Sequence, residues 1–328
     1  MSKIPVTVLT GFLGAGKTTL VNHILTAEHG HRIAVIENEF GEIPIDDALV
    51  LRSDEQFFEL SNGCCICCTA RTDLVDTLRK LVERKDKIDR VLIETTGLAD
   101  PNPVAQTFYV DDEVTEHFAL DAIVTLVDAK HIDQHLDEAG PDGVGHQAVD
   151  QIAFADRLVL NKVDLVDDAG VAAVRQRLRG INATAEIITS SYSQVDLADI
   201  LGVGAFNRIV HPAWLDEQEH FHDPAVTSVG VELADDFDEA ALRSWLSELT
   251  AEHGDDLYRL KGVVAVRGDA RRHVLQGIHR IFELRPADPW GRDARGSKVV
   301  FIGRNLDREL LTDGLRACTR SVPAAQLS

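Results

Sequence analysis

The sequence has few basic residues and no long hydrophobic run, and both absences exclude functions. Its 33 lysines and arginines stand against 54 aspartates and glutamates, a formal net charge of −21 over 328 residues. Such a charge repels nucleic-acid backbones and anionic lipid, so we expect neither as a partner, whereas cations are attracted. No segment approaches the run of about 20 apolar residues that spans a bilayer. The apolar start lacks a basic region and a small-residue cleavage site, so we expect a cytoplasmic protein.

Cysteines are also few, and they are not spread along the chain as a disulfide framework would be. Four of the five stand at positions 64, 65, 67 and 68. Neighbouring cysteines are poorly placed to bridge one another. The cluster therefore indicates metal binding or thiol redox chemistry, while the isolated Cys318 is typical of a packed side chain.

Residues 1–207 alternate between apolar strands and helical patterns. The expected strands are nearly continuous in apolar residues, which suits a parallel sheet covered on both faces. They are Val6–Leu9, Arg32–Ile36, Arg90–Ile93, Ala122–Val127, Arg157–Leu160 and Glu186–Thr189, with helices such as Thr18–Glu28, Thr72–Arg84 and Ala169–Leu178 between them. This alternation predicts an α/β fold with a doubly wound, mostly parallel sheet.

Residues 208–224 break this pattern, and we interpret them as a linker. The segment contains histidines and prolines among acidic residues. Beyond it, residues 225–328 predict a smaller C-terminal α+β domain. Its expected elements are strands at Thr227–Leu233, Val263–Val266, Val274–Phe282 and Val299–Ile302, and helices at Asp238–His253 and Asp307–Arg316.

The segment after the first expected strand carries a phosphate-binding motif. It reads Gly11-Phe12-Leu13-Gly14-Ala15-Gly16-Lys17-Thr18-Thr19 and fits G-x-x-x-x-G-K-[ST]. The motif stands between a strand and a helix, the context that a P-loop requires. We expect its backbone N–H groups to hold the phosphates, Lys17 to neutralise them and Thr18 to bind Mg²⁺. A glycine-rich turn without a ligand is the disfavoured alternative.

Two further motifs complete the nucleotide-site hypothesis. The strand ending at Glu94 places a carboxylate beside the expected Mg²⁺, and Gly97 can offer its N–H to the γ-phosphate. Asn161, Lys162 and Asp164 form N-K-x-D, whose aspartate accepts hydrogen bonds from guanine but finds no matching donors on adenine. GTP is therefore preferred over ATP, and Ser190 and Ser191 are expected to complete the base pocket.

The cysteine cluster lies between the P-loop helix and Glu94, where a GTPase carries its switch region. Thiolates select zinc, copper or iron–sulfur species over Mg²⁺. A buried cluster of small side chains and a thiol–disulfide switch are the alternatives. Upstream, Glu37 and Glu42 are candidates for further ligands or for positioning water. His131 and His135 have the i, i+4 spacing of a metal clamp, although such a pair is more often a solvated helix face.

Together these motifs resemble the CobW-like family of P-loop GTPases. The likeness rests on Thr10–Thr19, Glu37–Gly41, the Cys-x-Cys-Cys at 65–68, Glu94–Gly97 and Asn161–Asp164, and it continues through Leu257–Gly262, Pro289–Gly291 and Val300–Gly303. The resemblance implies Mg²⁺-dependent hydrolysis of GTP to GDP and phosphate, zinc binding and a role as a zinc metallochaperone. The zinc ligands that it implies are Glu37, Glu42, Cys65, Cys67, Cys68 and, as a further candidate, His117. Cys64 is an extra residue relative to the usual family motif.

These interpretations predict that GTP and a metal ion are coupled ligands. The γ-phosphate and Mg²⁺ would order the segment from Glu37 to Cys68, and hydrolysis would release it. No glutamine follows Gly97 to orient water, so slow turnover is expected. The expected partners are GTP, zinc or cobalt, a metalloprotein client and, as one option, a second copy of the chain. The rival hypotheses are a redox-sensing GTPase and a GTP-gated assembly factor, including one that delivers cobalt for cobalamin synthesis.

Overall fold

The computed structural model describes residues 3–37, 57–59, 69–97, 99–137, 145–205 and 226–320. The chain divides into two compact units. The first comprises Met1–Arg179 and Ala185–Phe206, and the second comprises Gly180–Thr184 and Asn207–Ser328. In the part of the chain that is described, no helix combines the length and the hydropathy needed to cross a membrane.

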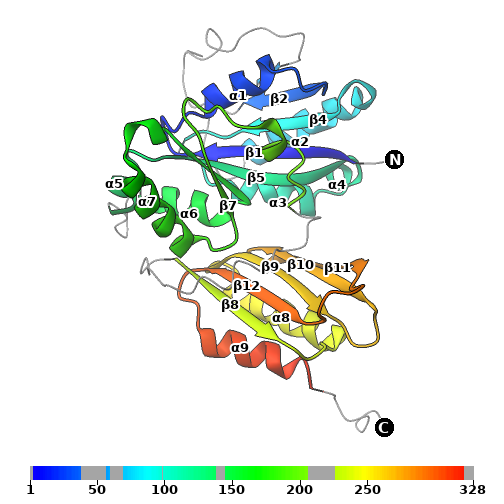
Figure 1. The fold of residues 1–328 in the computed structure, drawn as a ribbon. Coiled ribbons are helices and arrows are strands. Elements are labelled where there is room, and N and C mark those ends of the chain that lie inside the picture. The colour runs from blue at the N-terminus through cyan, green and yellow to red at the C-terminus, as the bar shows by residue number, and fades with distance from the viewer. Residues whose placement is uncertain are drawn as a thin grey trace. The chain divides into compact units, whose positions relative to one another are not determined.

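A seven-stranded parallel sheet forms the centre of the first unit within the described residues (Figure 1). From one edge to the other it consists of β3 (Phe57–Glu59), β2 (Ile33–Glu37), β4 (Arg90–Glu94), β1 (Ile4–Gly11), β5 (Phe118–Asp128), β6 (Arg157–Asn161) and β7 (Glu186–Thr189). The central strands are buried along nearly their whole length, because both faces of the sheet are covered. The predicted α/β fold is confirmed.

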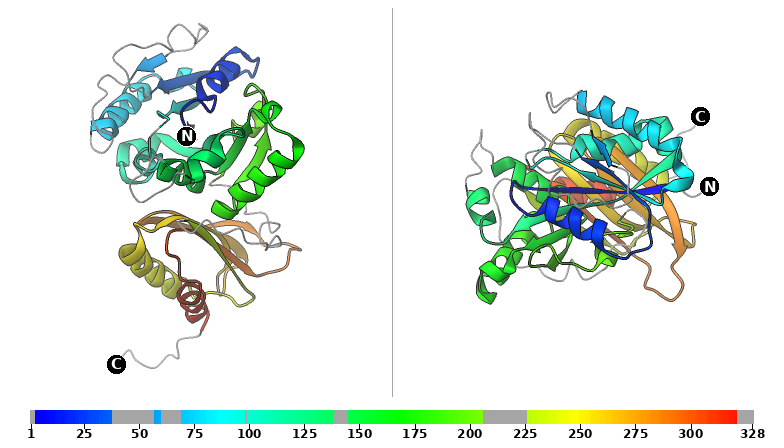
Figure 2. Two further views of the ribbon diagram at one scale, coloured as in Figure 1. Left: turned by 90° about the vertical axis from the view of Figure 1, so that its left-hand side faces the viewer. Right: turned by 90° about the horizontal axis from the view of Figure 1, so that it is seen from above.

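Helices cover both faces of this sheet. They are α1 (Lys17–Thr26), α2 (Thr69–Val82), α3 (Asn102–Val110), α4 (Asp112–His117), α5 (Ile132–Asp137), α6 (Gly145–Phe154) and α7 (Asp168–Ile181). Helix α1 packs Leu20, Val21 and Ile24 against β1 and its neighbours. The right-hand view of Figure 2 shows α1 and α2 on opposite sides of the sheet. Because the strands are parallel, every loop that follows a strand emerges at one edge, which we call the carboxyl edge.

The second unit is a five-stranded antiparallel sheet with two helices on one face. Its strands run in the order β11 (Ile281–Pro289), β10 (Arg271–Ile278), β9 (Leu257–Ala265), β12 (Ser297–Gly303) and β8 (Thr227–Leu233). The helices α8 (Glu239–His253) and α9 (Arg308–Ala317) bury Leu242, Leu246, Leu311 and Leu315 against it. This arrangement confirms the expected α+β class.

Two strand predictions in this unit had the wrong bounds. The expected strand Val274–Phe282 is a β-hairpin, since β10 ends at Ile278 and β11 begins at Ile281. Its turn contains His279 with φ of 49°. Glycine and asparagine are the residues that usually indicate this conformation, and neither stands at this position. Strand β9 begins at Leu257, six residues before the expected start, because Arg259 and Lys261 within it interrupt the apolar pattern although both are buried.

At the amino-terminal ends of the strands, the carboxylate of Asp121 fastens a loop to β5. Its two oxygens accept backbone hydrogen bonds from Gly202, Val203 and Gly204 at 2.9, 3.1 and 2.9 Å. Three consecutive N–H groups, of which that of Val203 is buried and the other two are half-buried, are thus satisfied by one side chain. This loop lies on the far side of the sheet from the carboxyl edge, so Asp121 is a stability determinant.

Replacing Asp121 with alanine is expected to destabilise the first unit by about 3 kcal/mol, because three buried or half-buried donors lose a charged acceptor. Urea unfolding of the full chain measures this. Trp245 and Trp290 lie in the described part of the second unit, so their fluorescence follows that unit, while far-ultraviolet circular dichroism follows both. Asp121→Asn, which keeps one acceptor oxygen, should lose less. An unchanged circular-dichroism midpoint in Asp121→Ala would contradict this role.

Cys318 is predicted to resist alkylation in the folded protein. It is buried after the last turn of α9, where its thiol donates to the carbonyl oxygen of Gly314 at 3.1 Å. Burial raises its pKa to about 11, with help from the negative charges of Asp238 and Glu248. At pH 8 only about one thiol in a thousand would then be ionised, and the thiolate is the reactive form. Iodoacetamide labelling with mass mapping should modify Cys318 only after denaturation; rapid native labelling would contradict its burial.

Candidate functional site

The loop between β1 and α1 has the backbone geometry of a phosphate-binding loop. Gly11 has φ of 139°, and a β-carbon there would stand 2.4 Å from the carbonyl oxygen of Leu126. Gly16 has φ of 108°, and its β-carbon would stand 2.5 Å from Nδ2 of Asn161. Only glycine fits both positions. Helix α1 begins directly afterwards at Lys17, so the positive end of the helix dipole faces the loop and favours an anion.

The amine of Lys17 lies across this loop. The side chain is only 8% exposed, and Nζ donates to the carbonyl oxygens of Gly11 at 2.8 Å and Phe12 at 3.3 Å. These carbonyls hold a buried positive charge at the place where the motif predicts the phosphates. A phosphate oxygen is a stronger partner for an ammonium group than a neutral carbonyl. The arrangement therefore suits Lys17 to bind the terminal phosphates of a nucleotide.

Thr18 and Glu94 meet across the sheet and provide oxygen ligands for Mg²⁺. Thr18 is the second residue of α1, and Glu94 ends β4, whose register pairs it with Leu9 of β1. The Thr18 hydroxyl donates to Oε1 of Glu94 at 3.4 Å. A hydroxyl and a carboxylate beside a phosphate site form the hard-oxygen donor set that Mg²⁺ prefers. The residues present thus fit this ion.

The side chain of Asn161 joins the base-recognition motif to the P-loop. It is 2% exposed, and its Nδ2 donates to the carbonyl oxygen of Ala15 at 2.9 Å and to Oγ of Ser193 at 3.0 Å. Its Oδ1 accepts from Oγ of Ser190 and from the N–H of Ser193, both at 2.9 Å. Ser190, which we expect in the base pocket from the sequence, is thus bound through its hydroxyl to Asn161.

Lys162 and Asp164 of the same motif differ in exposure. Lys162 has φ of 62°, and its amine donates to Oδ2 of Asp128 at 2.7 Å. Asp164 lies in the short 3₁₀ helix Val163–Leu165 and is exposed, so its carboxylate can meet a base. Burial alone raises the pKa of Asp128, but hydrogen bonds from Lys162, His131 and the N–H of Lys130 outweigh it and hold that pKa below its usual value. Asp128 therefore stays ionised and fixes Lys162.

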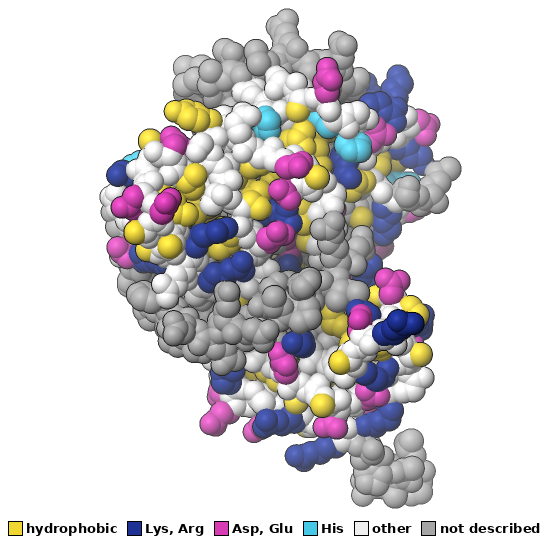
Figure 3. Space-filling view, in the orientation of Figure 1, with side chains coloured by type: hydrophobic (Ala, Val, Ile, Leu, Met, Phe, Trp, Pro, Cys, Tyr) yellow, Lys and Arg dark blue, Asp and Glu magenta, His cyan; other side chains and the backbone are white. Residues whose placement is uncertain are grey.

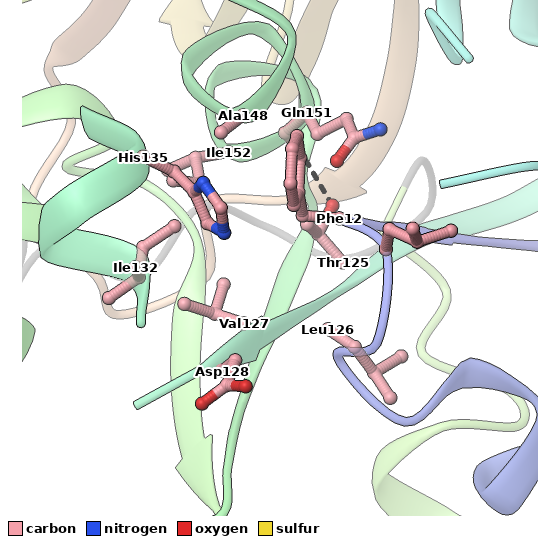
Figure 4. Close-up of a pocket in the computed structure, with 11 residues that line it drawn as sticks. Phe12, Thr125, Leu126, Val127, Asp128, Ile132, His135, Ala148, Gln151 and Ile152 are labelled. Carbon is pink, nitrogen blue, oxygen red and sulfur yellow. Dashed lines mark hydrogen bonds between the residues drawn. The ribbon is translucent and has the colours of Figure 1, made fainter. Parts of the chain in front are cut away.

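A small pocket lies behind the P-loop, between β5 and the helices α5 and α6 (Figure 4). Its lining includes Phe12, Val127, Ile132, His135 and Gln151. The rings of Phe12 and His135 are in contact, with centroids 4.0 Å apart at 39°. The ring of His131 instead contacts Asp128, so the two histidines at i, i+4 spacing do not share a ligand. Their suggested metal-clamp role is not realised in this geometry.

Three residues with evident roles at this edge were not predicted from the sequence. They are Asp128, which holds Lys162; Ser193, which binds Asn161; and Gln151, which binds the chain after Glu94. Asp128 could have been found by the signal that revealed Glu94, because it too ends an apolar strand at the carboxyl edge. Ser193 and Gln151 carry no comparable sequence signal.

The expected zinc ligands are described only in part. Glu42, Cys65, Cys67 and Cys68 lie outside the described residues. The backbone of Glu37 ends β2, level with Glu94 of β4 and with Glu59 of β3. Among the residues that are described, no group of three or more His, Cys, Asp or Glu side chains is arranged to hold a metal. The backbone of Glu37, from which the chain leads on to the cysteines, therefore lies beside that of Glu94, the expected Mg²⁺ ligand.

His117 lies at the other end of the strands. It ends α4, and the next residue, Phe118, pairs with Ile4 at the start of β1, whereas Glu94 pairs with Leu9. Five strand residues separate these levels, or roughly 16 Å. The structure thus does not bring His117 together with Glu37, and any ligand role for His117 belongs to a separate site.

On the face shown in Figure 3, basic and acidic side chains of the described residues are interspersed. A nucleic-acid-binding surface gathers its lysines and arginines into a patch or stripe. The described part of this face offers none. The strongest local feature of the protein is instead the polar cluster at the carboxyl edge.

Both parts of the chain match known families. Residues 5–189 match the family described as "CobW/HypB/UreG, nucleotide-binding domain", and residues 226–319 match the "Cobalamin synthesis protein cobW C-terminal domain". The chain is 37% identical to the zinc chaperone YjiA of Escherichia coli over 94% of this chain and 96% of YjiA. It is 36% identical to the zinc chaperone CobW of Pseudomonas aeruginosa over 96% and 92%.

A eukaryotic relative and a solved structure extend this similarity. The zinc-regulated GTPase metalloprotein activator 1 of Schizosaccharomyces pombe is 32% identical over 94% of this chain and 84% of the relative. The crystal structure of Zn(II)-bound YjiA GTPase from E. coli matches with a TM-score of 0.78 and 33% identity, covering 98% of this chain and 100% of that one. The family resemblance inferred from the motifs is confirmed, and the chain belongs to the CobW family of P-loop nucleotide-binding proteins.

Proposed function

We propose that this protein is a zinc-binding GTPase that acts as a metal chaperone, with nucleotide state controlling its hold on the metal. One observation carries the proposal: the P-loop, the Mg²⁺ acid Glu94 and the guanine motif converge on one edge of the sheet, tied together by Asn161. The relatives that share this architecture are named zinc chaperones and a zinc-regulated GTPase.

Binding of the triphosphate uses the loop, Lys17 and the first turn of α1. The N–H groups of residues 11–19 bind the phosphate oxygens, and Lys17 exchanges its carbonyl partners for the β- and γ-phosphates. Thr18 and Glu94 hold Mg²⁺, directly or through water. When bound there, the ion neutralises charge that develops on the β- and γ-phosphate oxygens.

Base selection is assigned to Asp164, supported by Asn161, Lys162 and Ser190. The exposed carboxylate accepts hydrogen bonds from N1–H and the 2-amino group of guanine. Adenine has no donor at N1 or C2, so its binding would desolvate this carboxylate without replacing its partners. Asp128 fixes the amine of Lys162 and thereby holds the strand end in the required shape.

Hydrolysis is an in-line attack of water on the γ-phosphorus. A new P–O bond forms to the water oxygen, the bond to the β–γ bridging oxygen breaks, and GDP leaves with that electron pair while the water proton passes to the phosphate or to solvent. We assign to the N–H of Gly97 a contact with the γ-phosphate. Leu98, not glutamine, follows Gly97, so intrinsic turnover should be slow and open to acceleration by a partner.

Zinc is the cargo, and we assign Glu37, Glu42, Cys65, Cys67 and Cys68 as its candidate ligands. The segment that contains them starts at the end of β2, in register with Glu94. With nucleotide bound, contacts from the γ-phosphate and Mg²⁺ would order the segment that follows Glu37, and phosphate release would free it. A coupling of about 1–3 kcal/mol changes metal affinity about 5- to 150-fold.

The two parts of the chain divide the work. We assign nucleotide and metal chemistry to residues 1–207, a linker role to residues 208–224, and recognition of a metalloprotein client to residues 225–328. We place the protein in the cytosol, where GTP is available and thiols stay reduced. His117 is kept as a candidate ligand of a separate metal site.

Asp164→Asn is predicted to change base preference. The new amide presents N–H donors to the donors of guanine, so GTP affinity should fall roughly 100-fold, as expected for two hydrogen bonds to a charged group. Xanthine carries a carbonyl at C2, and xanthosine triphosphate should bind better to the variant than to the wild type. Fluorescent-nucleotide titration measures both. Asp167→Asn, an exposed neighbour with the same loss of charge, is the control and should leave both affinities unchanged; an Asp164→Asn variant that still prefers GTP would refute the assignment.

Zinc affinity is predicted to depend on nucleotide state and on Cys67. Competition with a chelating dye under reducing conditions should give tighter binding with a non-hydrolysable GTP analogue than with GDP, each with Mg²⁺. Cys67→Ala should abolish the tight site. Cys318→Ala is the matched control, because this cysteine is buried in the second unit, and it should bind zinc like the wild type.

The same titration separates the rival functions. Binding that ignores both nucleotide and Cys67 would count against a chaperone. A reversible disulfide among the clustered cysteines without stoichiometric zinc would favour a redox sensor. Cobalt, tested under the same conditions, should bind more weakly than zinc, as it does at most such sites, and cobalt binding as tight as zinc would count against zinc as the cargo.

A further inference from the structure

The side chain of Gln151, in α6, is hydrogen-bonded to the backbone at the switch glycine Gly97 and two residues after it. Its Nε2 donates to the carbonyl oxygen of Gly97 at 3.2 Å and to that of Ala99 at 3.1 Å. Both N–H bonds of the carboxamide are used, one for each carbonyl. The two acceptors stand on either side of residue 98, so a single side chain fixes the path of the segment that follows Glu94.

Gln151 is itself held in place by the core of the first unit. Gln151 is 1% exposed, and its backbone carbonyl oxygen accepts a hydrogen bond from Oγ1 of Thr125 at 2.8 Å, the bond drawn in Figure 4. Thr125 belongs to β5, next to the P-loop strand, and Ala148 and Ile152 of α6 are buried beside it. A donor held by the core in this way cannot follow a loop that moves.

The P-loop confines the same segment from the other side. A β-carbon on Gly97 would stand 2.8 Å from both the N and the Cα of Leu13. The backbone of Gly97 therefore packs directly on the P-loop backbone, and only glycine allows this approach. Gly97 is thus held between Leu13 and Gln151.

From this geometry we propose that Gln151 is a positioning residue for the GTPase reaction, which presets the switch glycine Gly97 to meet the γ-phosphate. The inference rests on the proposed function. Gln151 is buried with both donors engaged, so it touches neither nucleotide nor attacking water and acts through Gly97. Preorganisation means that a γ-phosphate binds a backbone N–H that is already in place, without the cost of ordering the turn.

The chemistry of the side chain supports a positioning role over simple packing. Burying a glutamine costs desolvation of its carboxamide, and an apolar side chain of the same length would fill the space without that cost. The side-chain hydrogen bonds of Gln151 go to the segment after Glu94, and only its backbone carbonyl bonds to the core strand β5. GDP lacks the γ-phosphate that Gly97 would contact, so these side-chain bonds affect the triphosphate state selectively.

Gln151→Met tests the proposal, because it keeps side-chain length and removes both donors. We expect its affinity for a non-hydrolysable GTP analogue to fall about 10- to 30-fold, the loss of two neutral hydrogen bonds. Its GDP affinity should stay within about threefold of the wild type. The kcat for GTP hydrolysis should fall together with the affinity for the GTP analogue. Hydrogen exchange in the peptide Thr95–Pro101 should become faster in the GDP state.

Thr125→Val is the matched control. It removes the bond to the Gln151 carbonyl but leaves the carboxamide donors, so it should lower stability without changing the ratio of the two affinities or the exchange of that peptide. The proposal is overturned if Gln151→Met leaves the ratio of GTP-analogue affinity to GDP affinity unchanged. It is also overturned if Thr125→Val changes this ratio as much as Gln151→Met does. If the wild type itself neither binds nor hydrolyses GTP, the proposed function fails instead. Should Gln151→Met fold poorly, exchange of the wild-type peptide decides: fast exchange with GDP contradicts a preset turn.

Discussion

The carboxamide of Asn161 is the interaction on which the nucleotide site depends. It makes four hydrogen bonds, two as donor and two as acceptor, to Ala15, Ser190 and Ser193. These partners come from the P-loop and from the loop after β7, which are far apart in sequence. A parallel sheet brings all its carboxyl ends to one edge, but it does not fix the loops there to each other. Asn161 supplies that link, and a buried amide with all its groups paired has no spare capacity to shift.

Backbone strain gathers around the same side chain. Lys162, Tyr192 and Ser193 have φ of 62°, 54° and 56°, a left-handed conformation that costs a residue with a side chain about 1–2 kcal/mol. Ser193 offsets part of this cost, because its N–H donates to Asn161 and its hydroxyl donates to the carbonyl oxygen of Gly16 at 3.0 Å. The strained residues flank the expected base pocket. Strain that persists beside a site, and that the surrounding bonds over-determine, is the usual mark of a functional conformation.

Local patterns predicted the fold and the motif residues because both depend on short-range chemistry. Continuous apolar runs such as Ala122–Val127 identify buried parallel strands, and the P-loop needs only its own glycines, Lys17 and Thr18. The hairpin turn at His279 escaped prediction because tertiary packing, not a turn-forming residue, imposes its positive φ. Gln151 escaped because its partners, Gly97 and Ala99, are more than fifty residues away and are backbone groups that any sequence would offer. Only the folded chain reveals such a contact.

The register of β2 and β4 suggests why nucleotide and zinc should be coupled, and with which sign. Glu37 and Glu94 are level on adjacent strands, which lie about 4.8 Å apart in any sheet. Mg²⁺-GTP carries about one more negative charge than Mg²⁺-GDP. At roughly 10 Å, one charge acting on a divalent ion is worth about 1 kcal/mol in water and about 3 kcal/mol at an effective dielectric constant of 20.

That electrostatic difference favours zinc in the triphosphate state and weakens it once phosphate has left. Its size matches the coupling that commonly links two ligands in one protein. If Glu37 is a zinc ligand as proposed, capture with GTP and release after hydrolysis are the expected direction of the coupling, without a long-range conformational change.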